Sequence, residues 1–241
     1  MLKPVQDIIS RFRTEDSFAA IEALCREPDA LAAAKAFAEA ANDFYWKDKD
    51  LASSVMAGRA GVQYALTAAI RSELSDVSLA SVLRGQAKAM AYNLASFTWP
   101  GWDEPGIVIG PAELAAGLDS AKANLRLAIE LNKGPLPMSR AHWMLAAHEL
   151  AALRHADAQR NFAKACEQAI KTGAEAERWL SVGFGILSEL LEGGDGTDEA
   201  KQALALRLEE AESRLKSLEN GGMFIQQIQT ARRVFGKGAG S

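Results

Sequence analysis

The stretch Trp179-Leu180-Ser181-Val182-Gly183-Phe184-Gly185-Ile186 decides the fold of this 241-residue chain. Its large apolar residues recur at intervals of three and four, which is the spacing of one buried face on an α-helix. Gly183 lies on that face, and a residue with almost no side chain lets a second helix approach closely. Bulky residues one turn away then fill the flanking grooves. The stretch therefore predicts a helix packed tightly against a neighbouring helix.

The same spacing of large and small residues recurs along the chain. Phe37-x-x-Ala40-Ala41-x-x-Phe44 repeats it, and Ala91-Tyr92-Asn93-Leu94-Ala95 carries its middle part. A second pattern places a small, a large and a small residue at intervals of four and three. It occurs at Ala121, Leu125 and Ala128, and again at Ala158, Phe162 and Ala165. The two patterns predict helices packed in antiparallel hairpins with short connections.

Helical periodicity covers almost the whole chain, and the breaks fall on Pro, Gly, Asn and Asp. The expected helices cover about residues 4–12, 15–26, 30–47, 51–72, 78–98, 111–132, 137–154, 157–172, 175–192, 197–219 and 222–235. Only Gly106–Gly110 resembles a strand, and a single strand has nothing to pair with. The sequence therefore predicts an all-α fold of about ten helices.

These patterns resemble the tetratricopeptide repeat (TPR) family, whose first helix reads W-x-x-L-G-x-x-Y and whose second carries Ala, an aromatic residue and Ala. The resemblance implies a right-handed α-solenoid of stacked helical hairpins. It implies a single domain with capping helices in residues 1–29 and four helix pairs in residues 30–219. Residues 220–241 then form a C-terminal helix and a mobile tail.

The repeat is degenerate. The small residues that anchor the second helices are separated by 68, 37 and 42 residues, where the family repeats at about 34. These anchors are Ser53, Ala121, Ala158 and Ala200. An irregular helical bundle is therefore the alternative to a repeat array.

Charge and composition limit the partners. The chain has 27 Lys and Arg against 31 Asp and Glu, so no general cationic field attracts nucleic acid or an anionic membrane. No apolar run has the length of a signal peptide or a membrane span, so we expect a cytoplasmic protein. Cys25 and Cys166 lack a CxxC arrangement and are expected as buried small hydrophobic residues, with a disulfide between them left open.

No motif points to catalysis. His148-Glu149 lacks the second histidine of a zinc-binding HExxH motif, because position 152 is Ala. His148 is instead expected at a helix surface or C-terminus. Gly183-Phe184-Gly185 is not preceded by a strand, as a dinucleotide site requires. We therefore expect no enzyme, no metal and no cofactor.

The connection Trp99–Pro111 is the most distinctive segment, because it carries two of the five Trp residues between prolines and glycines. Trp99 and Trp102 beside Asp103 and Glu104 are candidate binding anchors, since indoles on a stiff loop are typical of binding hot spots. The alternative is a structural plug, in which the segment folds back and buries its Trp side chains.

The resemblance adds further candidates, because TPR arrays bind their ligands on the inner face of the first helices. It assigns Tyr92, Ser96 and Trp99 to that face in the second pair, and Arg140, Trp143 and Ala147 in the third. The family's carboxylate clamp needs Lys or Arg and Asn at two of these positions, so a receptor for chaperone tails is not expected. The candidate binding residues are Tyr92, Ser96, Trp99, Trp102, Asp103, Glu104, Arg140 and Trp143, and Trp143 has a core position as its alternative.

These observations favour a non-enzymatic interaction module, a TPR-like adaptor or scaffold that binds a peptide segment or partner protein in an aromatic-lined groove. A small-molecule receptor closed by the Trp99–Pro111 connection is the first alternative, and an enzyme without familiar motifs is the second. Pairing through terminal helices to form a homo-oligomer is also compatible with an array that has exposed ends.

Overall fold

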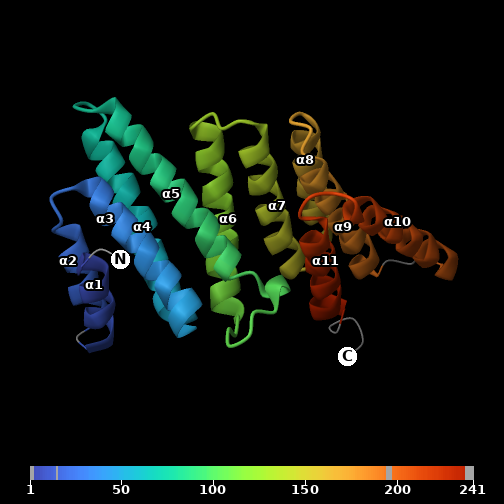
Figure 1. Ribbon diagram of the computed structural model, residues 1–241, viewed down its shortest axis with the longest axis horizontal. Helices are drawn as coiled ribbons and strands as arrows, with labels where there is room; N and C mark the ends of the chain where they lie inside the picture. Colours follow the sequence, from blue (N-terminus) through green and yellow to red (C-terminus); the bar gives the residue numbers. More distant parts are fainter. Residues whose placement is uncertain (1–2, 15, 194–196, 237–241) are drawn as a thin grey trace. The chain divides into compact units, whose positions relative to one another are not determined.

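The computed structural model describes residues 3–14, 16–193 and 197–236, and these residues form an all-α fold without strands (Figure 1). The elements are α1 (Lys3–Thr14), α2 (Ser17–Cys25), α3 (Ala30–Asp43), η1 (Phe44–Asp48), α4 (Leu51–Ser72), α5 (Val77–Phe97), η2 (Pro100–Trp102), α6 (Pro111–Glu130), α7 (Pro135–Ala151), α8 (His155–Ile170), α9 (Glu175–Glu192), α10 (Asp198–Lys216) and α11 (Gly221–Gly236). The expected all-α class is confirmed. Of the mobile tail expected over residues 236–241, Gly236 is instead the last residue of α11, and residues 237–241 lie outside the described ranges.

The chain forms two compact units. Unit 1 comprises the residues up to Thr98 together with Gly106–Leu131, and unit 2 comprises Trp99–Pro105 together with the residues from Asn132 onward. The short segment Trp99–Pro105 thus belongs to unit 2, although the chain on both sides of it belongs to unit 1.

Aspartate side chains fix the starts of four helices in unit 1. Asp16, Asp29, Asp50 and Asp76 each accept a hydrogen bond from a backbone N–H in the first turn of α2, α3, α4 and α5. Such a cap satisfies a donor that has no partner within the helix, and removing one costs about 1 kcal/mol. The helix capped by Asp50, α4, begins at Leu51 and ends at Ser72, as the sequence predicted.

One expected helix is interrupted. The range 30–47 was expected as a single α-helix, but α3 ends at Asp43 and the chain continues as the π-helical turn η1. This turn stacks the ring of Tyr45 on Phe97 at 4.1 Å, and it ends at Lys49 with a φ of 54°. The stacking partner lies on another helix, so the local pattern alone did not indicate the turn.

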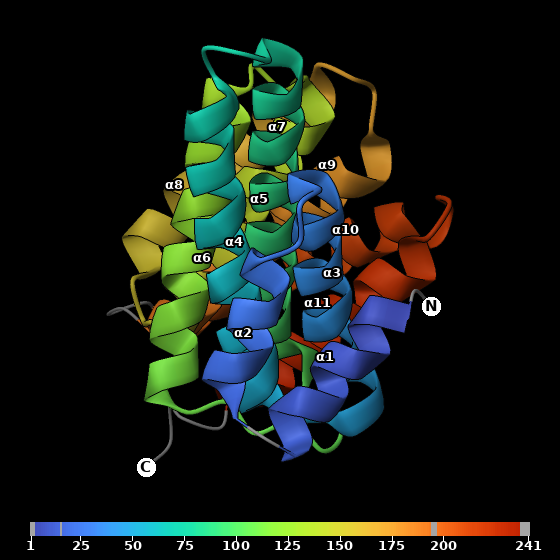
Figure 2. The same ribbon diagram turned by 90° about the vertical axis from the view of Figure 1, so that its left-hand side faces the viewer.

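In unit 1 each helix packs on the next, and α3 also contacts α5, which places α3, α4 and α5 side by side (Figures 1 and 2). Phe37 and Leu83 are fully buried between them. Gly61 of α4 allows this close approach, because a Cβ atom there would lie 2.6 Å from Cβ of Phe37.

Unit 2 repeats this arrangement with α7, α8, α9 and α10 packed in succession, and with α11 on α9 and α10. Gly183 lies where the sequence indicated a close approach, since a Cβ atom there would be 2.6 Å from Cδ1 of Ile228 on α11. The buried aromatic residues Phe162 and Phe184 form the centre of this unit.

The cysteines differ from the expectation of two buried residues. Cys25 at the end of α2 is exposed, Cys166 is half-buried, and both are free thiols. Cys25 is the last residue of its helix, where the chain turns to the surface. Among the described helices, none has the length and apolar character needed to span a membrane.

Candidate functional site

The candidate binding residues fall in both units. Trp99, Trp102, Asp103 and Glu104 lie in unit 2 with two residues of α7, Arg140 and Trp143. Tyr92 and Ser96 lie on α5 of unit 1.

Trp99 is completely buried in unit 2. Its indole Nε1 donates a hydrogen bond of 2.9 Å to the carbonyl oxygen of Ala147 at the end of α7. Its ring lies 5.9 Å from Phe184 on α9 and 6.1 Å from Phe235 on α11, centroid to centroid. Trp99 therefore packs as a core residue and ties η2 to three helices of the unit.

Gly101 makes room for this indole. A Cβ atom at Gly101 would lie 2.3 Å from Cζ2 and 2.4 Å from Cη2 of the Trp99 ring. The segment thus folds its backbone directly against the side chain that it buries.

Trp143 is also buried, at 6% exposure. Its ring meets Phe184 edge to face at 5.0 Å and lies 5.5 Å from Trp99. The indole Nε1 of Trp143 has no hydrogen-bond partner in the described ranges. This packing corresponds to the core alternative for Trp143.

The rest of the segment remains partly accessible. Trp102 is half-buried and meets Trp99 edge to face at 4.6 Å, while Asp103 is exposed and Glu104 is half-buried. Asp103 forms an ion pair of 2.7 Å with Arg233 of α11. The exposed part of the segment is therefore an indole beside a carboxylate that already has a basic partner.

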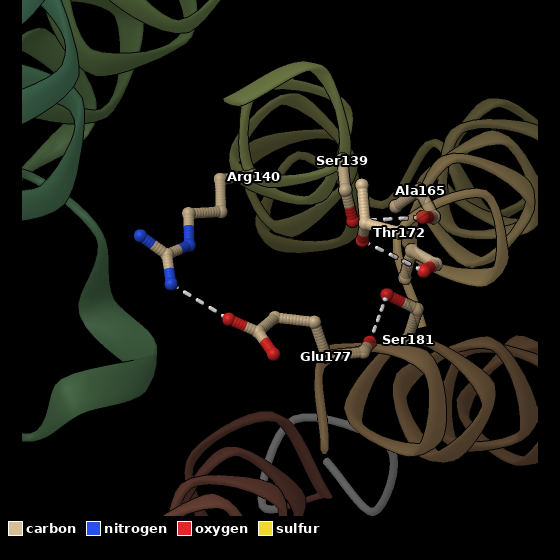
Figure 3. A network of polar contacts seen from close by, with 7 residues as sticks. Ser139, Arg140, Ala165, Thr172, Glu177 and Ser181 are labelled. Carbon is tan, nitrogen blue, oxygen red and sulfur yellow. Dashed lines mark hydrogen bonds and ion pairs between the residues drawn. The ribbon is translucent and has the colours of Figure 1, made fainter. Parts of the chain in front are cut away.

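Arg140 is exposed on α7, and its guanidinium pairs with Glu177 of α9 at 2.7 Å (Figure 3). The hydroxyl of Ser139 nearby joins α7 to α8 by donating to the carbonyl of Ala165, whereas Ser181 donates to the carbonyl of Glu177 within α9. A partner carboxylate that binds Arg140 would compete with Glu177.

In unit 1, Tyr92 and Ser96 are half-buried, and Nζ of Lys88 lies 6.0 Å from the ring centroid of Tyr92. The residues next to them, Asn93 and Phe97, line a shallow pocket that opens to solvent. Its other lining residues are Ala38, Ala41, Asn42, Gly58, Met90 and Leu94. The pocket is thus an apolar space between α3, α4 and α5 that carries two amide side chains.

Sequence reasoning missed the pocket residues Asn42 and Asn93. Both are half-buried, and their side-chain amides have no hydrogen-bond partner in the described part of the chain. The available signal was an amide within an apolar helical pattern, as in Ala91-Tyr92-Asn93-Leu94-Ala95. That signal did not show that α3 and α5 bring two such amides to one pocket.

A second polar group joins α7 to α8. Nδ1 of His142 and Oδ1 of Asn161 are 3.0 Å apart, and Nδ2 of Asn161 donates to Oε2 of Glu149 at 2.8 Å. Burial lowers the pKa of His142 below its usual value, and burial raises the pKa of the Glu149 carboxyl. Both shifts favour the uncharged forms.

His148 lies in the last turn of α7, as expected, but its side chain is fully buried and not at the surface. The turn packs inward because Ala147 and Leu150 around it are also core residues. In the described ranges, no group of three or more His, Cys, Asp or Glu side chains is arranged to hold a metal ion.

No protein-family model matches this chain, and a search of curated proteins finds no match.

Proposed function

We propose that the chain is a non-enzymatic interaction module of TPR-like type, which acts in the cytoplasm and binds an extended peptide segment of a partner protein. The pocket of unit 1 is the observation that carries this proposal. It offers an apolar surface for one side chain of the peptide, and its two amides offer donors and acceptors for the peptide backbone.

The geometry of the pocket favours a peptide over a small molecule. The pocket is a shallow apolar depression, because its roughly 220 Å³ of empty space includes open solvent, and it is far smaller than the enclosed cavities that hold drug-sized ligands. Asn42 on α3 and Asn93 on α5 both line the pocket, so both amides are available to a peptide that enters it.

The residues beside the pocket on α5 indicate which peptide residues would bind there. Tyr92 and Ser96 on α5 flank the pocket residue Asn93 along the same helix and would contact the peptide beyond the pocket. The candidates of unit 2, the half-buried Trp102 and the exposed Arg140, belong to a separate unit and are not part of this pocket. A segment with one apolar anchor and polar neighbours fits this set.

The test is selection of peptides from a random displayed library on the intact purified chain, followed by fluorescence anisotropy with the selected peptides. We expect Asn42→Ala/Asn93→Ala to weaken binding about tenfold, because each lost neutral hydrogen bond costs about 0.5–1.5 kcal/mol. Ala38→Phe, which fills the pocket from its half-buried rim, should abolish binding.

The matched control is Gln86→Ala, which removes an amide two turns before Asn93 on the same helix, at a position that does not line the pocket. It should leave the dissociation constant unchanged. All variants are compared at equal helical content by circular dichroism. Selected peptides that bind the double asparagine variant and Ala38→Phe as tightly as the wild type would refute the pocket as the binding site.

A further inference from the structure

The segment Pro105-Gly106-Ile107-Val108-Ile109-Gly110-Pro111 reads the same in both directions. Its central residues are β-branched and favour an extended backbone. The structure places Ile107–Ile109 outside every helix, and Gly110 is extended with a φ of −94° and a ψ of −179°. This run is thus a short strand-like piece in an all-α unit.

The backbone of this run lacks hydrogen bonds. Within the described ranges, neither the N–H nor the C=O groups of Ile107, Val108 and Ile109 have a partner. Gly110 differs, because its N–H donates to Glu113 at 3.0 Å and its carbonyl accepts from Leu114. Three consecutive residues therefore present an open strand edge, which is a template for pairing with another strand.

The side chains alternate as in a strand with one buried face. Ile107 and Ile109 pack against the buried cluster of Tyr45, Leu51 and Phe97, whereas Val108 is 85% exposed. Gly106 with a φ of +81° lies against the Lys49 side chain, where a Cβ atom would be 3.4 Å from Cγ. The run is thus held in place before any partner arrives, which lowers the ordering cost of pairing.

We propose that this segment pairs with the same segment of a second copy of the chain, as two antiparallel strands related by a twofold axis at Val108. Ile107 and Ile109 of each copy exchange N–H···O=C bonds with Ile109 and Ile107 of the other. Val108 then faces Val108 as the non-hydrogen-bonded pair between them.

The hydrogen bonds already made select this edge and register. Pairing through the Val108 edge would be limited to the two bonds of Val108 itself, because the N–H of Gly110 that would extend it is bonded to Glu113. Pairing through Ile107 and Ile109 uses only groups without partners. Pro105 and Pro111 cannot donate to a ladder, so they end the pairing symmetrically on both sides.

A second copy fits this edge because its own segment offers the backbone donors and acceptors that Ile107 and Ile109 need. It is extended, its backbone groups are unpaired, and the palindrome places β-branched residues opposite β-branched residues, with no charge across the pair. The contact has the same patch on both sides, as a twofold interface requires. The paired backbone groups lie outside the peptide pocket, although Phe97 contacts the segment and also lines that pocket.

The first test is sedimentation equilibrium of the intact chain. Because the paired area is small, we expect a weak dimer with a dissociation constant on the order of 0.1 mM. Val108→Lys and Val108→Glu each place like charges face to face and should raise the dissociation constant about tenfold. An equimolar mixture of these two variants should recover the dimer, because Lys then faces Glu.

The matched control makes the same pair of substitutions at Leu74, which is also fully exposed but lies outside the segment. These variants should dimerise like the wild type. A monomer at all concentrations would overturn the proposal, and so would a dimer that is insensitive to charge at position 108.

The second test reads the register directly by amide hydrogen exchange of the wild-type chain at low and high concentration. The amides of Ile107 and Ile109 should exchange several-fold more slowly at high concentration, and the amide of Val108 should not. Equal protection of all three amides, or of Val108 alone, would refute this pairing.

Discussion

Gly58 and Gly61 are one turn apart on α4, and both are buried, but they differ in what a methyl group would meet. A Cβ atom at Gly58 would lie 3.5 Å from Cδ2 of Leu94, which is an ordinary contact. At Gly61 it would lie 2.6 Å from Cβ of Phe37, an atom next to the backbone of α3. Only the second glycine is therefore required by packing.

We expect opposite signs for the two alanine variants. Gly58→Ala should raise the free energy of unfolding by about 0.5–1 kcal/mol, because alanine has the higher helix propensity. Gly61→Ala should lower it by about 1–3 kcal/mol, because α3 has to move away. Urea denaturation of the three proteins measures both values. Destabilisation by Gly58→Ala would show that α4 and α5 are closer than described.

At the scale of elements, the polar chain of His142, Asn161 and Glu149 links α7 to α8. Asn161 donates to Glu149 through Nδ2, so its Oδ1 accepts from Nδ1–H of His142. The pKa of His142 lies below its usual 6.5 because of burial, with Lys164 adding to the decrease and Glu167 opposing it.

This predicts how stability depends on pH. With a depressed folded pKa, the unfolded chain binds the proton more readily, so the His142 contribution is present above pH 6.5 and is lost as the pH falls through the folded pKa. His142→Gln should therefore reduce the loss of unfolding free energy between about pH 7 and pH 5. The folded pKa of Glu149 is raised, so its contribution to the unfolding free energy is present at low pH and is lost as the pH rises through that pKa. Thermal unfolding of both proteins across this range measures the difference, and identical pH profiles would contradict it.

Helix α9 was predicted at both ends, because its C-terminus is marked by Gly193 with a φ of 63° and its apolar spacing is regular. The π-helical turn after α3 was missed, since Tyr45 stacks on Phe97 more than fifty residues away. Local periodicity reports caps and buried faces, and it carries no information about such distant partners.

The candidate site shows the same limit. The sequence singled out Trp99 and Trp102, but the pattern did not separate a binding anchor from a plug. Trp99 is the buried residue of the pair. Gly101 leaves room for its ring, which contacts Ala147, Phe184 and Phe235. Asn42 and Asn93 were not identified, because their pocket forms only when α3 and α5 pack together.

At the scale of the whole molecule, Trp99–Pro105 is part of unit 2 although it is inserted between two parts of unit 1. Trp99→Ala should therefore destabilise unit 2 by about 3–5 kcal/mol through the cavity that it leaves. Hydrogen exchange should show faster opening of α7, α9 and α11, with protection in α3 and α4 unchanged. Loss of protection in α3 and α4 instead would mean that the segment stabilises unit 1.

The same placement of Trp99 has a consequence for synthesis on the ribosome. Trp99 emerges 136 residues before Phe235, one of the rings against which it packs. At a synthesis rate of about 5–20 residues per second, roughly 7–27 s pass between the emergence of Trp99 and that of Phe235. All residues of unit 1 have emerged once Leu131 has been synthesised. During that interval the nascent chain carries an indole whose core is incomplete, so unit 2 reaches its final packing only after the last helix has emerged.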